Sequence, residues 1–245
     1  MRVTTPSFRL AVYTVGDPQA PRLALCLPGY CDTKDYPDLR THADLLAARG
    51  YYAVAFDPPG TWGSGDIALY TTTNYLKAID ELVALYGARP TLLLGKSMGG
   101  RMAQLGAQNP AVCGLVSVVG SATGAIADDV ITEEAWVAHP RHAPHRDLPN
   151  DPTQFRDFTI PYSFVEDAAR YDALAVLPSL QMPKLYIAGQ DDTLVPPEKL
   201  RRAYDAAGDP KKFVVLPMGH DYRKDPAQLK LVNDTIAQWL SENNL

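Results

Sequence analysis

A serine flanked by glycines stands between a predicted strand and a predicted helix. The segment TLLLGKSMGG, residues 91–100, begins with the apolar residues of a buried strand, and apolar residues at helical spacing follow it. Within the segment, Gly95, Ser97 and Gly99 form the pattern GxSxG, which marks a sharp strand-to-helix turn that exposes a nucleophilic serine. A turn this tight strains the backbone and leaves no room for bulky neighbours. The pattern therefore predicts covalent catalysis by Ser97.

A serine hydroxyl becomes a good nucleophile only when a base removes its proton, so a histidine and an acid are expected later in the chain. Of the five histidines, only His220 directly follows a predicted strand, in LPMGHDY. The predicted strand KLYIAG runs into GQDDTLVP, which offers Asp191 and Asp192 as candidate acids. The order Ser97, Asp192, His220 is one of the known chain orders of serine triads. We predict that these three residues form the triad.

The elements that must position this triad alternate along the chain. Stretches of helical period, such as residues 35–50, 73–87 and 225–240, lie between short apolar runs. This alternation predicts the α/β class, with a mostly parallel central sheet and helices on both faces. Parallel strands end at one edge, where the triad residues would meet. The seven predicted strands are residues 8–15, 22–28, 51–57, 91–95, 115–120, 184–189 and 213–217.

One long segment, about residues 121–180, interrupts the alternation between the runs 115–120 and 184–189. These are the fifth and sixth of the runs just given, and we take them as the sixth and seventh strands of the sheet. The segment is too long for a plain loop and contains helical pieces. We therefore expect one domain, residues 1–245, with a cap inserted at the functional edge. Aromatic residues of the cap and of one core loop are candidates for contact with substrate, although some of them must anchor the cap. The candidates are Trp62, Trp136, Phe155, Phe158, Tyr162 and Phe164.

These motifs resemble those of the α/β-hydrolase superfamily, in particular cap-bearing serine esterases of the lysophospholipase-like and feruloyl-esterase-like kinds. The resemblance covers essentially the whole chain. GQDDTLVP matches the acid loop of that family, GxxDxxVP, with Asp192 in the acid position. The oxyanion loop of the family, His-Gly-X, corresponds to LPGY with Pro28 in place of the histidine. The resemblance thus implies that the backbone N–H groups of Tyr30 and Met98 bind the oxyanion.

The same resemblance implies a reaction. We expect hydrolysis of a carboxylic ester or similar acyl bond of a small molecule, through an acyl-enzyme on Ser97, with no metal and no organic cofactor. Thioester, amide and carbon–carbon bond hydrolysis use the same triad and stay open as alternatives. A ligand receptor that keeps the fold without turnover is the other alternative.

Composition argues against several other partners. The net charge of −5 disfavours nucleic acid. No apolar stretch reaches the roughly 18 residues of a membrane-spanning helix, and the N-terminal residues lack an apolar signal region, so we expect no membrane insertion and a cytoplasmic protein. The three cysteines cannot all pair with one another and are expected to be reduced. The sequence does not define the oligomeric state.

Two motifs suggest other chemistry and are set aside. Gly95-Lys96-Ser97 resembles the end of a phosphate-binding P-loop, but Pro90 stands where that motif requires a glycine. HPRHAPHRD, residues 139–147, raises the question of a metal or anion site. Its prolines and arginines favour a solvated basic loop instead.

Overall fold

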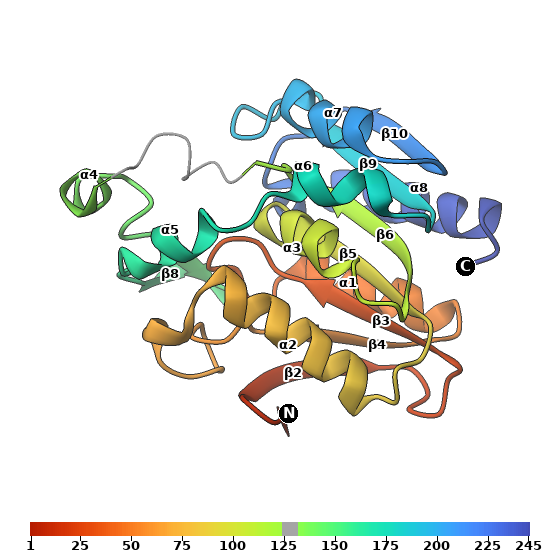
Figure 1. Ribbon diagram of the computed structural model, residues 1–245, viewed down its shortest axis with the longest axis horizontal. Helices are drawn as coiled ribbons and strands as arrows, with labels where there is room; N and C mark the ends of the chain where they lie inside the picture. Colours follow the sequence, from red (N-terminus) through yellow and green to blue (C-terminus); the bar gives the residue numbers. More distant parts are fainter. Residues whose placement is uncertain (124–131) are drawn as a thin grey trace.

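All seven predicted apolar runs form strands of one central sheet. The computed structural model describes residues 1–123 and 132–245. Its eight-stranded sheet has the order β1-β2-β4-β3-β5-β6-β9-β10 (Figure 1). Parallel pairing joins the strands from β4 to β10, whereas β2 pairs antiparallel with β1 and β4. The strands are β1 Arg2–Thr4, β2 Arg9–Val15, β3 Arg22–Leu27, β4 Tyr51–Phe56, β5 Thr91–Lys96, β6 Val112–Val118, β9 Lys184–Gly189 and β10 Lys211–Leu216.

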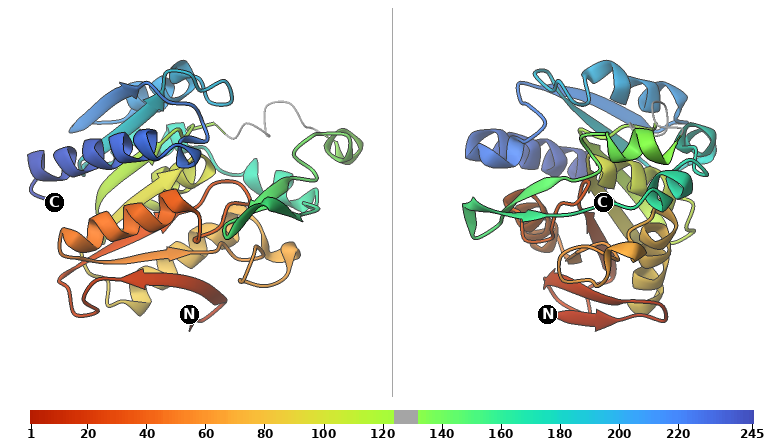
Figure 2. Two further views of the ribbon diagram at one scale, coloured as in Figure 1. Left: turned by 180° about the vertical axis from the view of Figure 1, so that it is seen from behind. Right: turned by 90° about the vertical axis from the view of Figure 1, so that its left-hand side faces the viewer.

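Helices cover both faces of this sheet, as the sequence predicted. One face packs against α2, α3, α6 and α7, and the other against α1 and α8. Figure 1 shows the first set in front of the sheet, and the view from behind in Figure 2 shows α1 and α8. The helices are α1 Pro37–Ala48, α2 Thr72–Leu85, α3 Met98–Gly106, α4 Glu133–Val137, α5 Ser163–Ala168, α6 Ala173–Val176, α7 Pro197–Ala206 and α8 Pro226–Glu242. Short 3-10 turns are η1 Ile67–Leu69, η2 Leu177–Ser179 and η3 Tyr222–Lys224.

Strand β3 illustrates why the core needs two helical layers. Its alternating side chains belong to two different clusters: Leu23, Leu25 and Leu27 face one, and Ala24 and Cys26 face the other. All five side chains are fully buried. A strand buried on both faces reads as a continuous apolar run, which explains the pattern seen in the sequence.

The strand order reverses around β3, which lies between β4 and β5. The loop after β3 and the turn after β5 therefore leave the sheet at neighbouring points of its carboxyl edge. Residues Tyr30 and Ser97 follow these two strands. A ligand site at this position is the general expectation for an open α/β sheet.

The described part of the segment between β6 and β9 lies outside the sheet. Because β1 adds a strand that the sequence did not indicate, this segment falls between the sixth and seventh strands of the sheet in chain order. It contains α4, the antiparallel hairpin of β7 His145–Leu148 and β8 Asp151–Asp157, and then α5 and α6. Figures 1 and 2 show α4, the hairpin and α5 projecting beyond one end of the sheet. The helical pieces were predicted, but the hairpin was not.

Candidate active site

Ser97 occupies a strained turn between β5 and α3. Its backbone has φ 53° and ψ −119°, a conformation that residues other than glycine rarely adopt. A Cβ at Gly95 would lie 2.0 Å from the carbonyl oxygen of Gly99, so the two glycines of the motif pass too closely for any other residue. The turn lifts the serine out of the regular strand at the carboxyl edge of the sheet. This geometry explains why the GxSxG pattern was informative.

His220 and Asp192 lie in line with the serine hydroxyl. The Nε2 atom of His220 is 3.0 Å from Ser97 Oγ, and its Nδ1 atom is 2.8 Å from Asp192 Oδ2. The other carboxylate oxygen of Asp192 accepts the backbone N–H groups of Leu194 and Val195, at 2.9 and 2.8 Å. The carboxylate is therefore fixed by its own loop and aimed at the imidazole. The structure brings the three predicted residues together in one chain of hydrogen bonds.

Asp192 and the neighbouring Asp191 differ in burial and in their hydrogen bonds. The Asp192 side chain is buried, whereas Asp191 is exposed to solvent. Asp191 contributes its backbone N–H to Met218 O, which holds the loop against the segment that leads to His220. Two further carboxylates follow β6 in the sequence, Asp128 and Asp129, and are alternative candidates for the acid; both lie outside the described residues.

The loop after β3 packs directly on the serine turn. A Cβ at Gly99 would lie 2.0 Å from Leu27 O, which shows how closely the two segments approach. In the described parts of the chain, the backbone N–H groups of Tyr30 and Met98 have no hydrogen-bond partner. Free N–H groups beside a nucleophile are the arrangement that stabilises an oxyanion. The positions predicted from the resemblance are thus available for that role.

A buried cation links the three loops of the site. Lys96, the residue before the serine, is 2% exposed and places its Nζ 3.2 Å from Asp32 Oδ2 and 3.6 Å from Asp221 Oδ1. Asp32 belongs to the loop after β3, and Asp221 follows His220 directly. Arg146 of β7 lies 3.8 Å from the other oxygen of Asp32. This cluster joins the serine turn, the predicted oxyanion loop and the histidine loop.

The charges in this cluster hold one another ionised. Burial opposes ionisation of Asp32, but the positive charges of Lys96 and Arg146 keep the pKa of its carboxyl below the usual range. Burial likewise opposes ionisation of Asp221, yet Lys96 and Lys224 lower its pKa to about 2. Although burial disfavours its charge, these carboxylates raise the pKa of the Lys96 ammonium. A cluster with paired charges resists rearrangement, so it rigidifies the loops that carry the site.

A cavity of about 360 Å³ opens on Ser97 and His220. Its walls come from the loops after β3, β5, β9 and β10 and from the segment that precedes β7. A second cavity, of about 540 Å³, shares His145, Arg146 and Asp221 with the first and therefore adjoins it. The first cavity is lined by Tyr30, Asp32, Lys96, Ser97, Pro140, Arg141, Pro144, His145, Arg146, Leu194, His220 and Asp221.

The aromatic residues predicted to contact substrate are not among those lining the first cavity. Trp136 is fully buried and donates its indole N–H to Ile160 O at 2.7 Å. Together with Phe158 and Phe164 it forms a cluster around Tyr30, against which Trp62 and Tyr162 also pack. In the described structure these five aromatic residues join the inserted segment to the core. Sequence reasoning could not separate this packing from substrate contact, because both use apolar rings.

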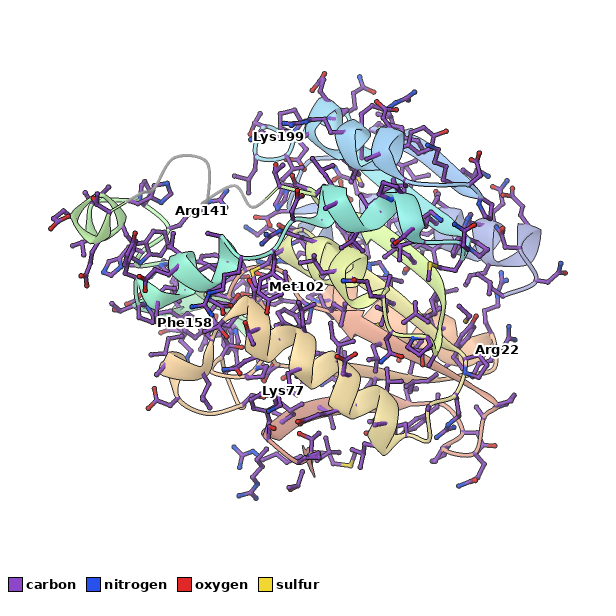
Figure 3. The ribbon with its side chains drawn as sticks, viewed as in Figure 1. Arg22, Lys77, Met102, Arg141, Phe158 and Lys199 are labelled. Atoms are coloured by element: carbon purple, nitrogen blue, oxygen red, sulfur yellow. The ribbon has the colours of Figure 1, made fainter. Side chains whose placement is uncertain are left out.

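Phe155 differs from the other five. Its side chain is 50% exposed and stacks on His145 with ring centroids 4.1 Å apart. It lines the second cavity, which adjoins the first. Figure 3 labels Phe158, its neighbour on the insertion, and Arg141, which lies on the wall of the first cavity.

The histidines of residues 139–147 have separate surroundings. His139 stacks on Trp136, His142 places its Nδ1 3.0 Å from Ile160 O, and His145 contacts Asp157. Within residues 1–123 and 132–245, no group of three or more His, Cys, Asp or Glu side chains is placed to hold a metal ion. In those same ranges, no helix is long and apolar enough to cross a membrane.

Several residues of the site escaped sequence reasoning. Lys96 was considered only as part of a phosphate-binding motif, and Asp32 carried no signal at all. Arg141 and Arg146 were visible within the basic stretch 139–147, but nothing in that stretch indicated that it faces the nucleophile. Such contacts depend on how distant loops pack, which local patterns do not encode.

A mostly parallel sheet with a strained serine at the end of β5, beside a histidine and a carboxylate, is the architecture of an α/β hydrolase. This chain belongs to the alpha/beta hydrolase family, which it matches over residues 24–232. The expected resemblance and fold class are confirmed.

Individual relatives are more distant. The chain is 25% identical over 219 residues to palmitoyl-protein thioesterase ABHD10, mitochondrial, of Mus musculus, covering 86% of this chain and 72% of that protein. The solved structure of alpha/beta hydrolase domain-containing protein 10 from mouse superposes with a TM-score of 0.79 at 20% identity, covering 99% and 98% of the two chains. Est1E from Butyrivibrio proteoclasticus, solved with ferulic acid bound, gives a TM-score of 0.77 at 18% identity, with coverage of 99% and 98%. These similarities in structure show a shared fold.

Proposed function

We propose that this hydrolase cleaves a carboxylic ester, or a closely related acyl bond, of a small molecule through an acyl-enzyme on Ser97. The observation that carries the proposal is the hydrogen-bond chain from Ser97 Oγ through His220 to Asp192, with distances of 3.0 and 2.8 Å. The strained backbone of Ser97 supports it, because strain of this kind concentrates at functional sites.

In the first step, Ser97 Oγ attacks the substrate carbonyl carbon while its proton passes to Nε2 of His220. The carbonyl π electrons move to oxygen, and the N–H groups of Tyr30 and Met98, which have no partner among the described residues, bind the resulting oxyanion. Asp192 stabilises the imidazolium and keeps the Nδ1 proton directed at its carboxylate.

The tetrahedral intermediate then collapses. The bond from carbon to the leaving oxygen or sulfur breaks, and His220 returns its proton to that leaving group. Water then gives a proton to His220 and attacks the carbonyl carbon of the acyl-enzyme. The bond from that carbon to Ser97 Oγ breaks, and His220 returns the proton to Oγ, which releases the acid and restores Ser97. The residues named supply every proton transfer in this sequence.

A thioester is the second candidate substrate. Its support is the relative in Mus musculus, which is named a palmitoyl-protein thioesterase. Both reactions use the same attack and the same oxyanion, and they differ only in the leaving group. We also infer that the segment 121–180 acts as a cap, since Arg141, Pro144 and His145 form part of the cavity wall.

The proposal is tested by activity and by covalent labelling. Native protein is expected to hydrolyse members of a panel of 4-nitrophenyl esters, acyl thioesters and aryl amides, and to react with a fluorophosphonate. Ser97→Ala should lower kcat by about 10⁴-fold or more and abolish labelling, because triad members act as a unit.

The thermal unfolding midpoint of Ser97→Ala should stay near the native value, which separates loss of chemistry from loss of fold. Native protein that is folded yet neither labelled nor active on any of these substrates would instead support the receptor alternative. Labelling that persists in Ser97→Ala would place the nucleophile elsewhere.

A further inference from the structure

Arg141 is one of the residues that line the cavity containing Ser97. Across the described residues, its guanidinium makes neither an ion pair nor a hydrogen bond. The backbone carbonyl of Arg141, in contrast, accepts a 2.7 Å hydrogen bond from the Tyr30 hydroxyl. The arginine is thereby tied to the loop that is proposed to bind the oxyanion, while its charge is left available. Figure 3 labels the side chain on the insertion.

Among the described residues, the charges of the cavity wall are not balanced. Its fixed cations are Lys96, Arg141 and Arg146, whereas its carboxylates are Asp32 and Asp221. Lys96 lies within ion-pair distance of both carboxylates, and Arg146 lies near Asp32. The surplus positive charge therefore falls on Arg141.

This surplus does not follow from the overall composition, because the chain carries a net charge of −5. Arg141 is also half-buried, and burial, with the neighbouring charge of Arg146, lowers the pKa of its guanidinium below the usual value. A cation placed in a partly desolvated cavity without a counter-ion is unfavourable unless a ligand supplies the negative charge. A basic residue with no role in the fold would normally extend into solvent.

The wall of the cavity combines charged and apolar side chains, which suits a ligand that has both a charged group and an apolar part. Its apolar side chains are those of Tyr30, Pro140, Pro144 and Leu194. The adjoining 540 Å³ cavity provides space for a further part of the molecule, and it too is bordered by basic residues, including Arg223 and Lys224. Arg223 is already paired with Asp147, at 2.9 and 2.6 Å, so Arg141 is the better candidate for ligand binding.

We propose that Arg141 binds an anionic group, a carboxylate or a phosphate, of the substrate whose carbonyl is attacked by Ser97. This inference rests on the proposed acyl-transfer function. The planar guanidinium can donate two parallel N–H bonds to either anion. The substrate class is therefore an acyl ester or thioester that carries a negative charge a short distance from the scissile bond.

The test compares pairs of substrates that differ only in charge. On the acyl side, the pair is 4-nitrophenyl hydrogen adipate and its neutral methyl ester. On the alcohol side, the pair is 3-acetoxybenzoate and 3-acetoxybenzamide. Native protein is expected to prefer the anionic member of at least one pair by about tenfold or more in kcat/KM, after subtraction of the enzyme-free rate. The pair that shows the preference identifies the side of the bond that carries the charge.

Arg141→Gln should reduce kcat/KM for the preferred anionic substrate by about 10- to 100-fold and leave its neutral partner within about threefold, the effect expected for loss of one charge-assisted contact. Arg141→Lys should retain part of the preference, because it keeps the charge but not the planar geometry. The matched control is Arg170→Gln, since Arg170 is another arginine of the same insertion and pairs with Asp167 away from the cavity. That control should keep the native preference.

A binding measurement separates this inference from the proposed function. Calorimetric titration of Ser97→Ala with adipate and with phenyl phosphate should show binding that is lost when Arg141→Gln is added. Such binding without turnover of any ester by native protein would refute the proposed hydrolysis and support the anion site. Turnover with equal kcat/KM for both members of each pair would support the hydrolysis and refute the anion site. Equal losses on charged and neutral substrates in folded Arg141→Gln would also refute it.

Discussion

At the scale of single residues, the two carboxylate oxygens of Asp192 have different hydrogen-bond partners. One oxygen accepts two backbone N–H groups, and the other faces His220. A carboxylate held in this way can fix the imidazole in one tautomer and stabilise its charged form. Asp191 lies beside it in sequence but is exposed, and its side chain has no such position.

We expect Asp192→Asn to lower kcat by about 10³- to 10⁴-fold, because an amide in this position favours the wrong imidazole tautomer. Asp191→Asn should stay within about threefold of native, as is usual for an exposed substitution. Initial rates on the best ester, with thermal melts of both variants, provide the comparison. The reverse ranking would transfer the role of the acid to Asp191.

The difference between predictable and unpredictable residues is already visible here. Ser97 and Asp192 sit in short patterns whose spacing is dictated by one turn or one loop, so the sequence alone indicated them. Asp32 is 64 residues from Lys96 in the chain, and their contact exists only because β3 and β5 are neighbours in the sheet. A local sequence pattern therefore cannot predict such a contact.

At the scale of elements, an aromatic cluster joins the inserted segment to the core. Trp136 of α4 is fully buried, and its neighbours in the cluster include Tyr30 of the core and Phe164 of α5. The amphipathic pieces of α4 and α5 were foreseeable from their periodicity. The β7–β8 hairpin was not, because β8 is exposed along its whole length and shows no apolar alternation.

We expect Trp136→Ala to destabilise the protein by about 3 to 5 kcal/mol, the usual cost of emptying the site of a buried tryptophan. Because the cluster surrounds Tyr30, the variant should also lose kcat/KM on all substrates alike. Urea unfolding and rates across an ester series measure the two effects. A stable variant with an altered order of substrates would mean that Trp136 contacts substrate instead.

Phe155→Ala is the matched contrast on the same insertion. The side chain is 50% exposed and lines the second cavity. Its removal should change unfolding free energy by less than about 1 kcal/mol. It should shift the relative kcat/KM of short and long acyl esters by about 1 to 3 kcal/mol. An unchanged order of substrates in the folded variant would exclude Phe155 from the substrate site.

At the scale of the whole molecule, the buried charged groups of the site are joined by further buried polar groups on α1, the helix that packs behind it. Asp38, in the first turn of α1, is fully buried, and within the described residues neither oxygen of its carboxylate has a hydrogen-bond partner. His42 on the same helix contacts Tyr222 of η3 and Asn233 of α8. The charged or titratable groups around Asp38 include Lys96, His42, Asp32, Arg223, Tyr222 and Cys26. Buried polar side chains thus connect the site with α1 and α8, and we call this set the polar interior.

Burial raises the pKa of Asp38 above its ordinary value, and the nearby cations Lys96 and Arg223 reduce this shift only in part. The folded state therefore keeps a proton on Asp38 at a pH where the unfolded chain, with a pKa of about 3.9, has released it. Wherever the folded state binds more protons than the unfolded state, stability falls as pH rises. Ionisation of Asp38 thus costs stability from about pH 4 up to the raised folded pKa, and the cost persists above that value.

We expect Asp38→Asn to abolish this cost, since an amide of the same shape carries no charge at any pH. The variant should be more stable than native protein at pH 7, and the difference should shrink as the pH falls toward about 4. Urea unfolding between about pH 4 and 8 measures the difference, with Asp44→Asn as the control because Asp44 lies on the same helix but is exposed. Asp44→Asn should bring no gain in stability. If Asp38→Asn is instead less stable at pH 7, the Asp38 carboxylate is ionised and needed as a partner of Lys96, and the polar interior is held together by its charges.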